Sequence, residues 1–525
     1  MLKKKSNLIL FGIIFCALVL RLVGITHGFP FIFHPDEPTI IRSALGLRFN
    51  PNPKHFDWPH FYIYLNYFLY MAFSKFRDIL GALKLRESVG ILFPLMWDDK
   101  LIFYYLTRCF SAILGALTVI PVYLSAKALF NRKASLIAAF CMAFLPFHVW
   151  HSHYSLGDVP MVFLLSWGLY FSCLILNSPV LGLGPNFKPK NYILSGFFIG
   201  LAASTKYNGG LSAFMVPVAH FLGILGKRQT DGEKIKIVNF GGILALILSG
   251  LGAFVGFLVG TPYALFDYKT FSRTDGPQGA FWQFSNVGSV GFEQHIKVQF
   301  LKELFINVSS NMGWVVIPIY VLTLGYLVYR IIKKKIESDE IKLVFLYSIS
   351  FYLFWYISGF KNTRAHYYFI FYPFAAVIFG FSVSKVYEWL NTKLNARLKF
   401  ISLIFVFLIC FPLVFFSARN SYAYFRGDTR NDMYVWLVSN INLGENIVYN
   451  DVKATDVLDH IGVDAEKGLD NLKNLDSAMV IVIDPENSED FLTKNSTYLT
   501  KVASFSNYLR LGPNIDIFRY NTVKQ

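Results

Sequence analysis

Apolar stretches of about 20 residues recur along the chain up to residue 417, and short polar segments separate them. A helix of that length can cross the hydrocarbon core of a bilayer, where backbone amides must be hydrogen-bonded within the segment. The pattern therefore predicts an all-α polytopic membrane protein. About eleven transmembrane helices are expected, near residues 7–25, 102–127, 134–150, 159–177, 192–206, 210–226, 237–260, 312–331, 341–358, 366–384 and 400–417.

Basic residues give these spans an orientation, because cytoplasmic loops carry an excess of Lys and Arg. The cytoplasmic side is assigned the basic clusters, which are Lys3 to Lys5, Arg132 with Lys133, Lys188 with Lys190, Lys227 with Arg228, Lys333 to Lys335, and Lys393 with Arg397 and Lys399. Residues 1–25 lack an obvious small-residue cleavage site and are interpreted as an uncleaved first span. A multi-pass protein of the plasma (inner) membrane is expected, with the last span ending outside the cytoplasm.

One aromatic segment, residues 58–76, does not fit as a span. If it crossed the membrane, Arg132 and Lys133 would lie outside unless the short piece 91–97 also crossed. Helices rich in Tyr and Phe are typical of the membrane interface. The first external loop is therefore predicted to contain interfacial helices.

The composition changes abruptly after Ser417. Residues 418–525 are polar and acidic, with short β-like runs at 446–449, 478–483 and 515–520 between Asn, Asp and Gly turns. About 100 residues are enough to bury a separate core. The predicted domains are a transmembrane domain, 1–417, and a small extracytoplasmic α/β domain, 418–525.

Overall composition agrees with a membrane protein and argues against nucleic-acid binding. The chain is 54% hydrophobic and 16% charged, and its mean hydropathy is +0.44. A net charge of +16 arises from Lys and Arg clusters dispersed between apolar spans. That distribution is a topology signal, whereas nucleic-acid binding needs a basic patch.

Candidate chemistry collects on the predicted external side. Asp36 and Glu37 stand next to His34 in the first external loop, just past the first span. The later external loops add His151, His153, Asp158, Lys206, Arg273, Lys361, Arg364 and His366. Acids together with separated cations suit a reaction that deprotonates a hydroxyl and releases an anionic leaving group. Sugar transfer from a lipid phosphate is such a reaction.

Each of these residues also has a purely structural interpretation. Asp36 and Glu37 flank the start of a surface helix and could simply cap it, and Asp158 precedes Pro160 at the start of a span, as an N-cap would. Cations near span ends commonly extend to the lipid headgroups, an interpretation that applies to Lys206, Arg108 and Arg21.

A metal site is a further alternative. His151 and His153 could bind a divalent metal together with Asp158 or His34. Their spacing of two residues does not place both on one helical face, which weighs against a shared ion.

Several short motifs occur along the chain in an order that can be compared with known families. They are Asp36-Glu37 after the first span, the run from Tyr105 through Arg108 to Thr118, Leu145-Pro146 followed by Asp158, the run from Gly200 to Lys206, Thr261-Pro-Tyr263, and Arg364-Ala-His-Tyr-Tyr368 with Pro373. Over about residues 1–390 this order resembles the membrane-embedded GT-C glycosyltransferases that use lipid-phosphate-linked sugars. That group contains protein O-mannosyltransferases and the aminoarabinose transferases that modify lipid A.

The resemblance implies an inverting transferase with its active site outside the cytoplasm. Asp36 would be the base, Glu37 its neighbour, and Asp158 a second acid that orients or binds the acceptor. The donor would be a polyprenyl- or dolichyl-phosphate sugar, and the acceptor a hydroxyl on a protein, lipid or glycan. Electrostatics suggests phosphate binding by Lys206 and Arg364. The two histidines His34 and His366 complete the predicted substrate-binding set.

Two other functions fit the same composition. A transporter or lipid flippase would carry ionisable residues or broken helices near the middle of several spans, whereas the charges here lie at span ends. A noncatalytic scaffold whose exported tail binds partners would tolerate replacement of Asp36.

Overall fold

The computed structural model describes residues 2–92, 95, 98, 100–183, 187–231, 236–287, 303–360, 363–395, 399–442 and 444–522. The chain forms two compact units. Unit 1 consists of Met1–Leu22 and Thr39–Ser417, and unit 2 of Val23–Pro38 and Ala418–Gln525. The segment Val23–Pro38, which the sequence analysis counted with the transmembrane domain, is thus part of the C-terminal unit.

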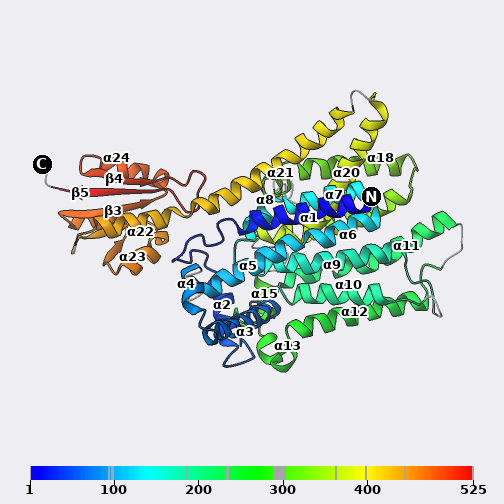
Figure 1. Cartoon of the computed structure of the whole chain (residues 1–525), viewed down its shortest axis with the longest axis horizontal. Coiled ribbons are helices and arrows are strands. Elements are labelled where there is room, and N and C mark those ends of the chain that lie inside the picture. The colour runs from blue at the N-terminus through cyan, green and yellow to red at the C-terminus, as the bar shows by residue number, and fades with distance from the viewer. Residues whose placement is uncertain are drawn as a thin grey trace. The chain divides into compact units, whose positions relative to one another are not determined.

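Unit 1 is a bundle of helices, of which α1, α5, α6, α9, α10 and α12 run side by side in Figure 1. The long helices are α1 (Leu2–Leu22), α5 (Leu101–Leu117), α6 (Val119–Leu129), α7 (Arg132–Ala143), α9 (Asp158–Asn177), α10 (Lys190–Ala203), α11 (Met215–Asp231), α12 (Phe240–Gly260), α18 (Val316–Ile332), α19 (Ser338–Ser358), α20 (Tyr372–Lys393) and α21 (Phe400–Arg426). The other described elements are α2 (Glu37–Gly46), α3 (Phe61–Ala82), α4 (Arg86–Leu92), α8 (Pro146–His151), η2 (Tyr207–Phe214), α13 (Tyr263–Phe266), α14 (Tyr268–Phe271), α15 (Ala280–Asn286), η4 (Glu303–Val308), α17 (Ser309–Asn311) and η5 (Ala365–Phe371).

The structure confirms a mostly helical integral membrane protein, but not the number of crossings. Within the described residues, seven helical stretches are long and apolar enough to span a membrane, namely Leu101–Leu129, Asp158–Asn177, Tyr207–Arg228, Phe240–Gly260, Ser338–Ser358, Ala365–Lys393 and Phe400–Arg426. Asn7–Leu22 and Val316–Ile332 are shorter apolar helices. The predicted spans 134–150 and 192–206 correspond to helices of 12 and 14 residues, α7 and α10.

A proline explains the break inside the predicted span 134–150. Helix α7 ends at Ala143, and α8 begins with Pro146 as its first residue. Proline lacks the backbone N–H that would continue the helix, and it pushes the preceding residue toward extended conformations. Leu145 is indeed extended, at φ −70° and ψ 113°.

Helices α10 and α12 pack closely because glycines line their contact. A Cβ placed on Gly196 or Gly200 would lie 2.0 Å from the carbonyl oxygen of Ser249 or Ala253, respectively. Small residues at such interfaces let helix backbones approach in the membrane.

We expect Gly200→Leu to lower the thermal unfolding temperature of the detergent-purified protein, because overpacking a tight contact typically costs about 1–3 kcal/mol. Gly250→Leu on the same helix pair is the matched control, since a Cβ there meets nothing within 4 Å. Equal melting temperatures for the two variants would show that the close contact contributes nothing to stability.

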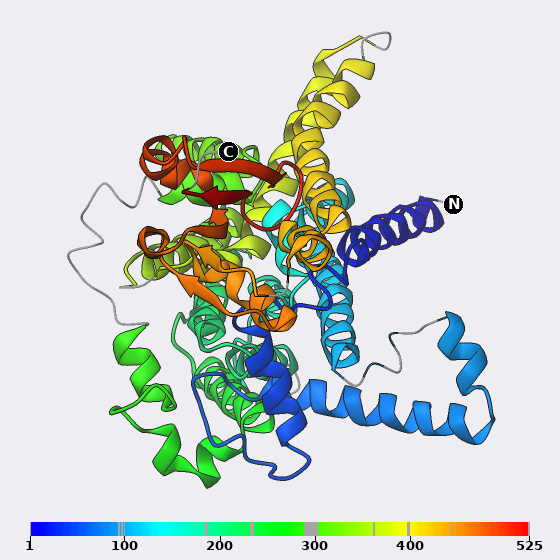
Figure 2. The ribbon, with the colours of Figure 1, turned by 90° about the vertical axis from the view of Figure 1, so that its left-hand side faces the viewer.

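The aromatic segment of the first external loop forms α3, which packs on α5. Tyr62 and Tyr70 are buried there, and Tyr70 shares a hydrogen bond with Thr107 of α5. Figure 2, in which the green helices α9 and α10 are seen end-on, shows the blue α3 side-on. Helix α3 therefore crosses the direction of the bundle helices, as a helix lying along a membrane surface would.

Unit 2 is a small α/β domain with a five-stranded sheet in the order β2-β1-β3-β5-β4. Its elements are α22 (Thr429–Asn440), β1 (Ile447–Tyr449), η7 (Val452–Ala454), α23 (Thr455–Ile461), β2 (Ala465–Lys467), η8 (Leu469–Asn474), β3 (Ser477–Ile483), η9 (Pro485–Ser488), α24 (Glu489–Lys494), β4 (Leu499–Phe505) and β5 (Ile515–Asn521). Strands β2, β1 and β3 pair in parallel, and β5 pairs antiparallel with both β3 and β4.

Alternation along β3 gives this sheet two buried faces. Met479 and Ile481 pack with Leu437 of α22 on one face. Val480 and Val482 belong to a second apolar cluster. Successive side chains of a strand point to opposite faces, so a run of apolar residues is what such a doubly covered strand requires. The three predicted strands are β1, β3 and β5.

Two arginines contradict the prediction that they reach the headgroups, because Arg21 and Arg108 are both buried. The guanidinium of Arg21 donates to the backbone oxygens of Ala17 and Ala143, each at 2.9 Å, and lies 3.0 Å from Nδ1 of His148. Arg21 therefore ties α1 to the end of α7 and to α8. A buried cation of this kind must have its donors satisfied.

Candidate functional site

The centre of the site in unit 1 is an ion pair between Asp158 and Lys206. Asp158 is the first residue of α9, and Lys206 is the extended residue before η2. Nζ of Lys206 lies 2.5 Å from Oδ1 of Asp158, and the side chains are only 15% and 2% exposed. Buried, hydrogen-bonded ion pairs are screened far less than surface pairs.

A glycine next to Asp158 explains why the backbone segments that carry Asp158 and Lys206 come so close. A Cβ on Gly157 would lie 3.1 Å from the carbonyl oxygen of Thr205, so glycine leaves room for the backbone just before Lys206. The N-cap residue of α9 is Gly157, which makes no side-chain capping bond. Asp158 is therefore not the N-cap, and its carboxylate pairs with Lys206 instead.

Aromatic rings and histidines surround the pair. Nζ of Lys206 lies 5.2 Å from the ring centroid of Tyr367 and 5.9 Å from that of Trp58, distances at which cation–π attraction operates. The rings of His151 and His366 lie 5.4 Å apart. Both histidines are close enough to contribute to the electrostatic environment of Asp158. Neither Trp58 nor Tyr367 was predicted as a site residue, although Trp58 begins the aromatic segment 58–76 and Tyr367 lies in the motif from Arg364 to Tyr368.

Arg364 is an exposed arginine near the ion pair's histidines along the chain. It precedes η5 in an extended conformation, two residues before His366, and its side chain is exposed. Among the described residues, its guanidinium has no hydrogen-bond or ion-pair partner. A guanidinium offers a planar fork of donors that matches a phosphate.

The two acids of the first loop differ in their surroundings. Glu37 is buried and is the first residue of α2, whereas Asp36 is half-buried. The backbone N–H of Asp36 donates to Nδ1 of His34 at 3.2 Å. In the described part of the chain, the Asp36 carboxylate makes no hydrogen bond or ion pair, so it does not cap α2.

The predicted site residues are thus divided between the two units. Asp158, Lys206 and His366 come together in unit 1, with Arg364 in the segment next to His366. His34, Asp36 and Glu37 lie in the part of the chain assigned to unit 2.

A metal centre finds no support in the described residues. No group of three or more His, Cys, Asp or Glu side chains among them is arranged to hold an ion. His153 is buried, and its Nδ1 lies 2.9 Å from the carbonyl oxygen of Val149, which fixes that ring locally.

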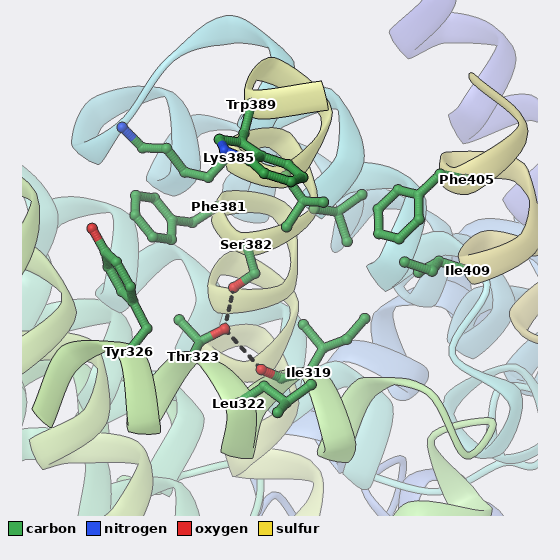
Figure 3. Close-up of a pocket in the computed structure, with 12 residues that line it drawn as sticks. Ile319, Leu322, Thr323, Tyr326, Phe381, Ser382, Lys385, Trp389, Phe405 and Ile409 are labelled. Atoms are coloured by element: carbon green, nitrogen blue, oxygen red, sulfur yellow. Dashed lines mark hydrogen bonds between the residues drawn. The ribbon is translucent and has the colours of Figure 1, made fainter. Parts of the chain in front are cut away.

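A pocket of about 600 Å³ lies between α18, α20 and α21 (Figure 3). The hydroxyls of Thr323 and Ser382 bond to each other in its wall. Among the described residues, Lys385 is the only charged residue that lines it, and its Nζ is paired with Asp339 at 2.9 Å. The pocket adjoins the half of α20 away from His366 and contributes no acid to the candidate chemistry.

Part of the chain matches known proteins in sequence. Residues 106–250 match the family described as dolichyl-phosphate-mannose-protein mannosyltransferase. The dolichyl-phosphate-mannose–protein mannosyltransferase 1 of Saccharomyces cerevisiae is 28% identical over 184 residues, which are 34% of this chain and 20% of the yeast protein. The chain thus spans about a fifth of the length of that curated relative.

Solved structures that match the chain have low sequence identity and TM-scores below 0.5. ArnT from Cupriavidus metallidurans bound to undecaprenyl phosphate is 11% identical, with a TM-score of 0.45 over 97% of both chains. The Archaeoglobus fulgidus oligosaccharyltransferase in its apo form is 14% identical, with a TM-score of 0.48 over 94% of this chain and 73% of that one. The sequence match confirms the resemblance to glycosyltransferases that use lipid-phosphate-linked sugars, over the segment that contains Arg108, Asp158 and Lys206.

Proposed function

We propose that the protein is an inverting glycosyltransferase that moves one sugar from a polyprenyl- or dolichyl-phosphate carrier to an acceptor hydroxyl. The observation that carries the proposal is the buried Asp158–Lys206 pair, which lies in the segment that matches the mannosyltransferase family. Arg364, whose guanidinium has no partner among the described residues, lies two residues from His366, and the His366 ring is 5.4 Å from that of His151. A leaving phosphate needs preorganised positive groups of this kind.

In this mechanism the carboxylate of Asp36 accepts the proton of the acceptor hydroxyl. The acceptor oxygen then attacks the anomeric carbon from the face opposite the phosphate, and the bond between that carbon and the phosphate oxygen breaks. The configuration inverts, and the carrier leaves as a lipid phosphate. Lys206 and Arg364 stabilise the growing negative charge, while Asp158 fixes the position of the Lys206 ammonium.

We further propose that all eleven predicted spans cross the membrane, including those formed by α1, by α7 with α8, by α10 and by α18. This places Asp36 and residues 418–525 outside the cytoplasm at the plasma (inner) membrane, and α3 at the membrane interface. In intact cells, Asp36→Cys in a background without other cysteines should react with a membrane-impermeant thiol reagent, whereas Lys335→Cys should react only after lysis. Labelling of position 36 only after lysis would overturn this topology.

The activity is tested with purified protein and a panel of radiolabelled polyprenyl-phosphate sugars. One donor should lose its label to water or to an added acceptor. If no donor loses label while the protein moves an intact lipid or solute across vesicles, the transporter or flippase interpretation is correct instead.

Arg364→Ala should raise the KM for the donor or slow phosphate departure by about 10- to 100-fold, since hydrogen bonds to charged groups contribute about 1.5–3 kcal/mol. Arg364→Lys should lose less, because it keeps the charge but not the planar fork. Initial rates over a range of donor concentrations provide the measurement.

Arg273→Ala is the control for Arg364, because Arg273 is an exposed arginine in another loop, paired with Asp275 at 2.9 Å. If Arg364→Ala and Arg273→Ala show the same donor dependence as the unmodified protein, Arg364 does not belong to the site.

A further inference from the structure

The segment Val23–Pro38, which contains Asp36, contributes to the core of unit 2. Phe31 is only 6% exposed and belongs to the same apolar cluster as Met433 and Leu437 of α22. Its ring also meets the edge of Tyr434, with 5.2 Å between centroids. Near the start of the segment, a Cβ on Gly24 would lie 2.4 Å from the backbone of Tyr424, so the backbones at these two positions are in close contact.

Two polar side chains from the first turn of α22 hold the same segment. Nδ2 of Asn431 donates to the carbonyl oxygen of Phe29 at 2.8 Å. The guanidinium carbon of Arg430 lies 3.5 Å from the ring centroid of Phe33, a close cation–π contact. Arg430 is itself fixed, because Nε and Nη2 donate to the two carboxylate oxygens of Asp428 at 2.8 and 2.7 Å.

These contacts extend to within three residues of the proposed base. Phe33 is followed by His34, whose Nδ1 accepts the backbone N–H of Asp36. Helix α22 therefore holds the segment at Phe29, Phe31 and Phe33, and a local hydrogen bond ties the backbone of Asp36 to His34, the residue after Phe33. A general base must be kept within hydrogen-bond reach of the proton that it removes, and small displacements are costly.

We propose that α22 of the C-terminal unit positions Asp36 for the transfer, with Arg430 and Asn431 as positioning residues. This inference rests on the proposed function, in which Asp36 is the base. It assigns the C-terminal unit the role of holding the catalytic loop, so that the unit is required for the chemical step whatever the acceptor.

The test uses the full-length purified protein and the variants Phe33→Leu, Arg430→Met, Arg430→Lys and Asn431→Ala. Phe33→Leu keeps an apolar side chain but removes the ring face, and Arg430→Met removes the cation. Phe33→Leu, Arg430→Met and Asn431→Ala should each lower kcat about tenfold and leave the donor KM within about twofold. The reason is that the donor contacts are untouched and only the base is misplaced. Arg430→Lys should restore most of kcat, since an ammonium also binds a ring face.

Lys501→Met is the matched control. Lys501 lies on the edge strand β4, pairs with Asp516 at 2.6 Å, and sits 5.7 Å from the ring centroid of Phe518. This variant loses the same two kinds of contact in the same unit, and its kcat should stay near that of the unmodified protein.

Amide hydrogen exchange separates displacement of the loop from collapse of the unit. In Phe33→Leu and Arg430→Met, exchange should rise in residues 23–38 while β3 stays protected. If Arg430→Met also raises exchange in β3, the positioning role is judged from Phe33→Leu, because that replacement lies in the loop itself and not in α22.

Two different results overturn the two proposals. Unchanged kcat and unchanged exchange in Phe33→Leu and Arg430→Met, with Asp36→Asn inactive, would overturn the positioning role alone. Full activity of Asp36→Asn would overturn the proposed base and this inference with it.

Discussion

Asp36→Asn is expected to reduce sugar transfer by about 10²- to 10⁴-fold, the usual contribution of a general base. The amide keeps the size of the side chain but cannot accept a proton. The Asp36 carboxylate has no hydrogen-bond partner among the described residues, so the replacement breaks no such contact. Expression, membrane insertion and donor KM should therefore stay close to those of the unmodified protein, and the loss should appear in kcat.

Two further variants serve as comparisons for Asp36→Asn. Asp275→Asn removes an exposed acid in another loop, one that pairs only with exposed Arg273, and it should leave the rate unchanged. Glu37→Gln alters a buried acid at the start of α2, so its effect should include a lower unfolding temperature. Wild-type transfer by Asp36→Asn would eliminate Asp36 as the base.

Breaking the Asp158–Lys206 pair from one side should be the most damaging change to unit 1. Lys206→Met or Asp158→Asn leaves one partner of a largely buried pair without its counter-charge, which typically costs about 3–5 kcal/mol. We expect lower unfolding temperatures and no measurable transfer. Lys206→Arg should retain the fold, because it keeps a cation between Asp158 and the Tyr367 ring.

The double variant Asp158→Asn with Lys206→Met separates stability from chemistry. Removing both charges should restore most of the unfolding temperature, since neither partner is left unpaired. Transfer should stay absent, because the phosphate has lost a cation. Lys133→Met is the control, since its 3.5 Å pair with Glu388 is 57% and 35% exposed and worth at most about 1 kcal/mol. Recovery of transfer in the double variant would show that the pair is purely structural.

Local pattern was enough to predict much of the fold. The long apolar stretches became helices, and the β-like runs after Ser417 became β1, β3 and β5. Strand β2, only Ala465–Lys467, and strand β4 were missed, because their residues are mostly exposed and lack a continuous apolar run. The division into α7 and α8 was signalled by Pro146 but was outweighed by the apolar length of 134–150.

Contacts between distant segments could not be predicted in the same way. Asp158 and Lys206 were both singled out, but nothing in their spacing of 48 residues shows that they pair. Arg21 looked like a headgroup residue because the α7 oxygen that it binds, that of Ala143, lies far along the chain. Trp58 entered the site only through the fold. Each case is a tertiary contact that the local pattern does not contain.

The contact between Phe29 and Asn431 joins residues that are 402 positions apart. A ribosome adding about 5–20 residues per second needs about 20–80 s to make that stretch. During that interval the loop around Phe29 has no α22 to bind, and Phe31 and Phe33 lack their partners in that helix. A nascent chain halted before residue 431 would therefore lack the Asn431 contact that holds Phe29, even with its earlier helices already synthesised.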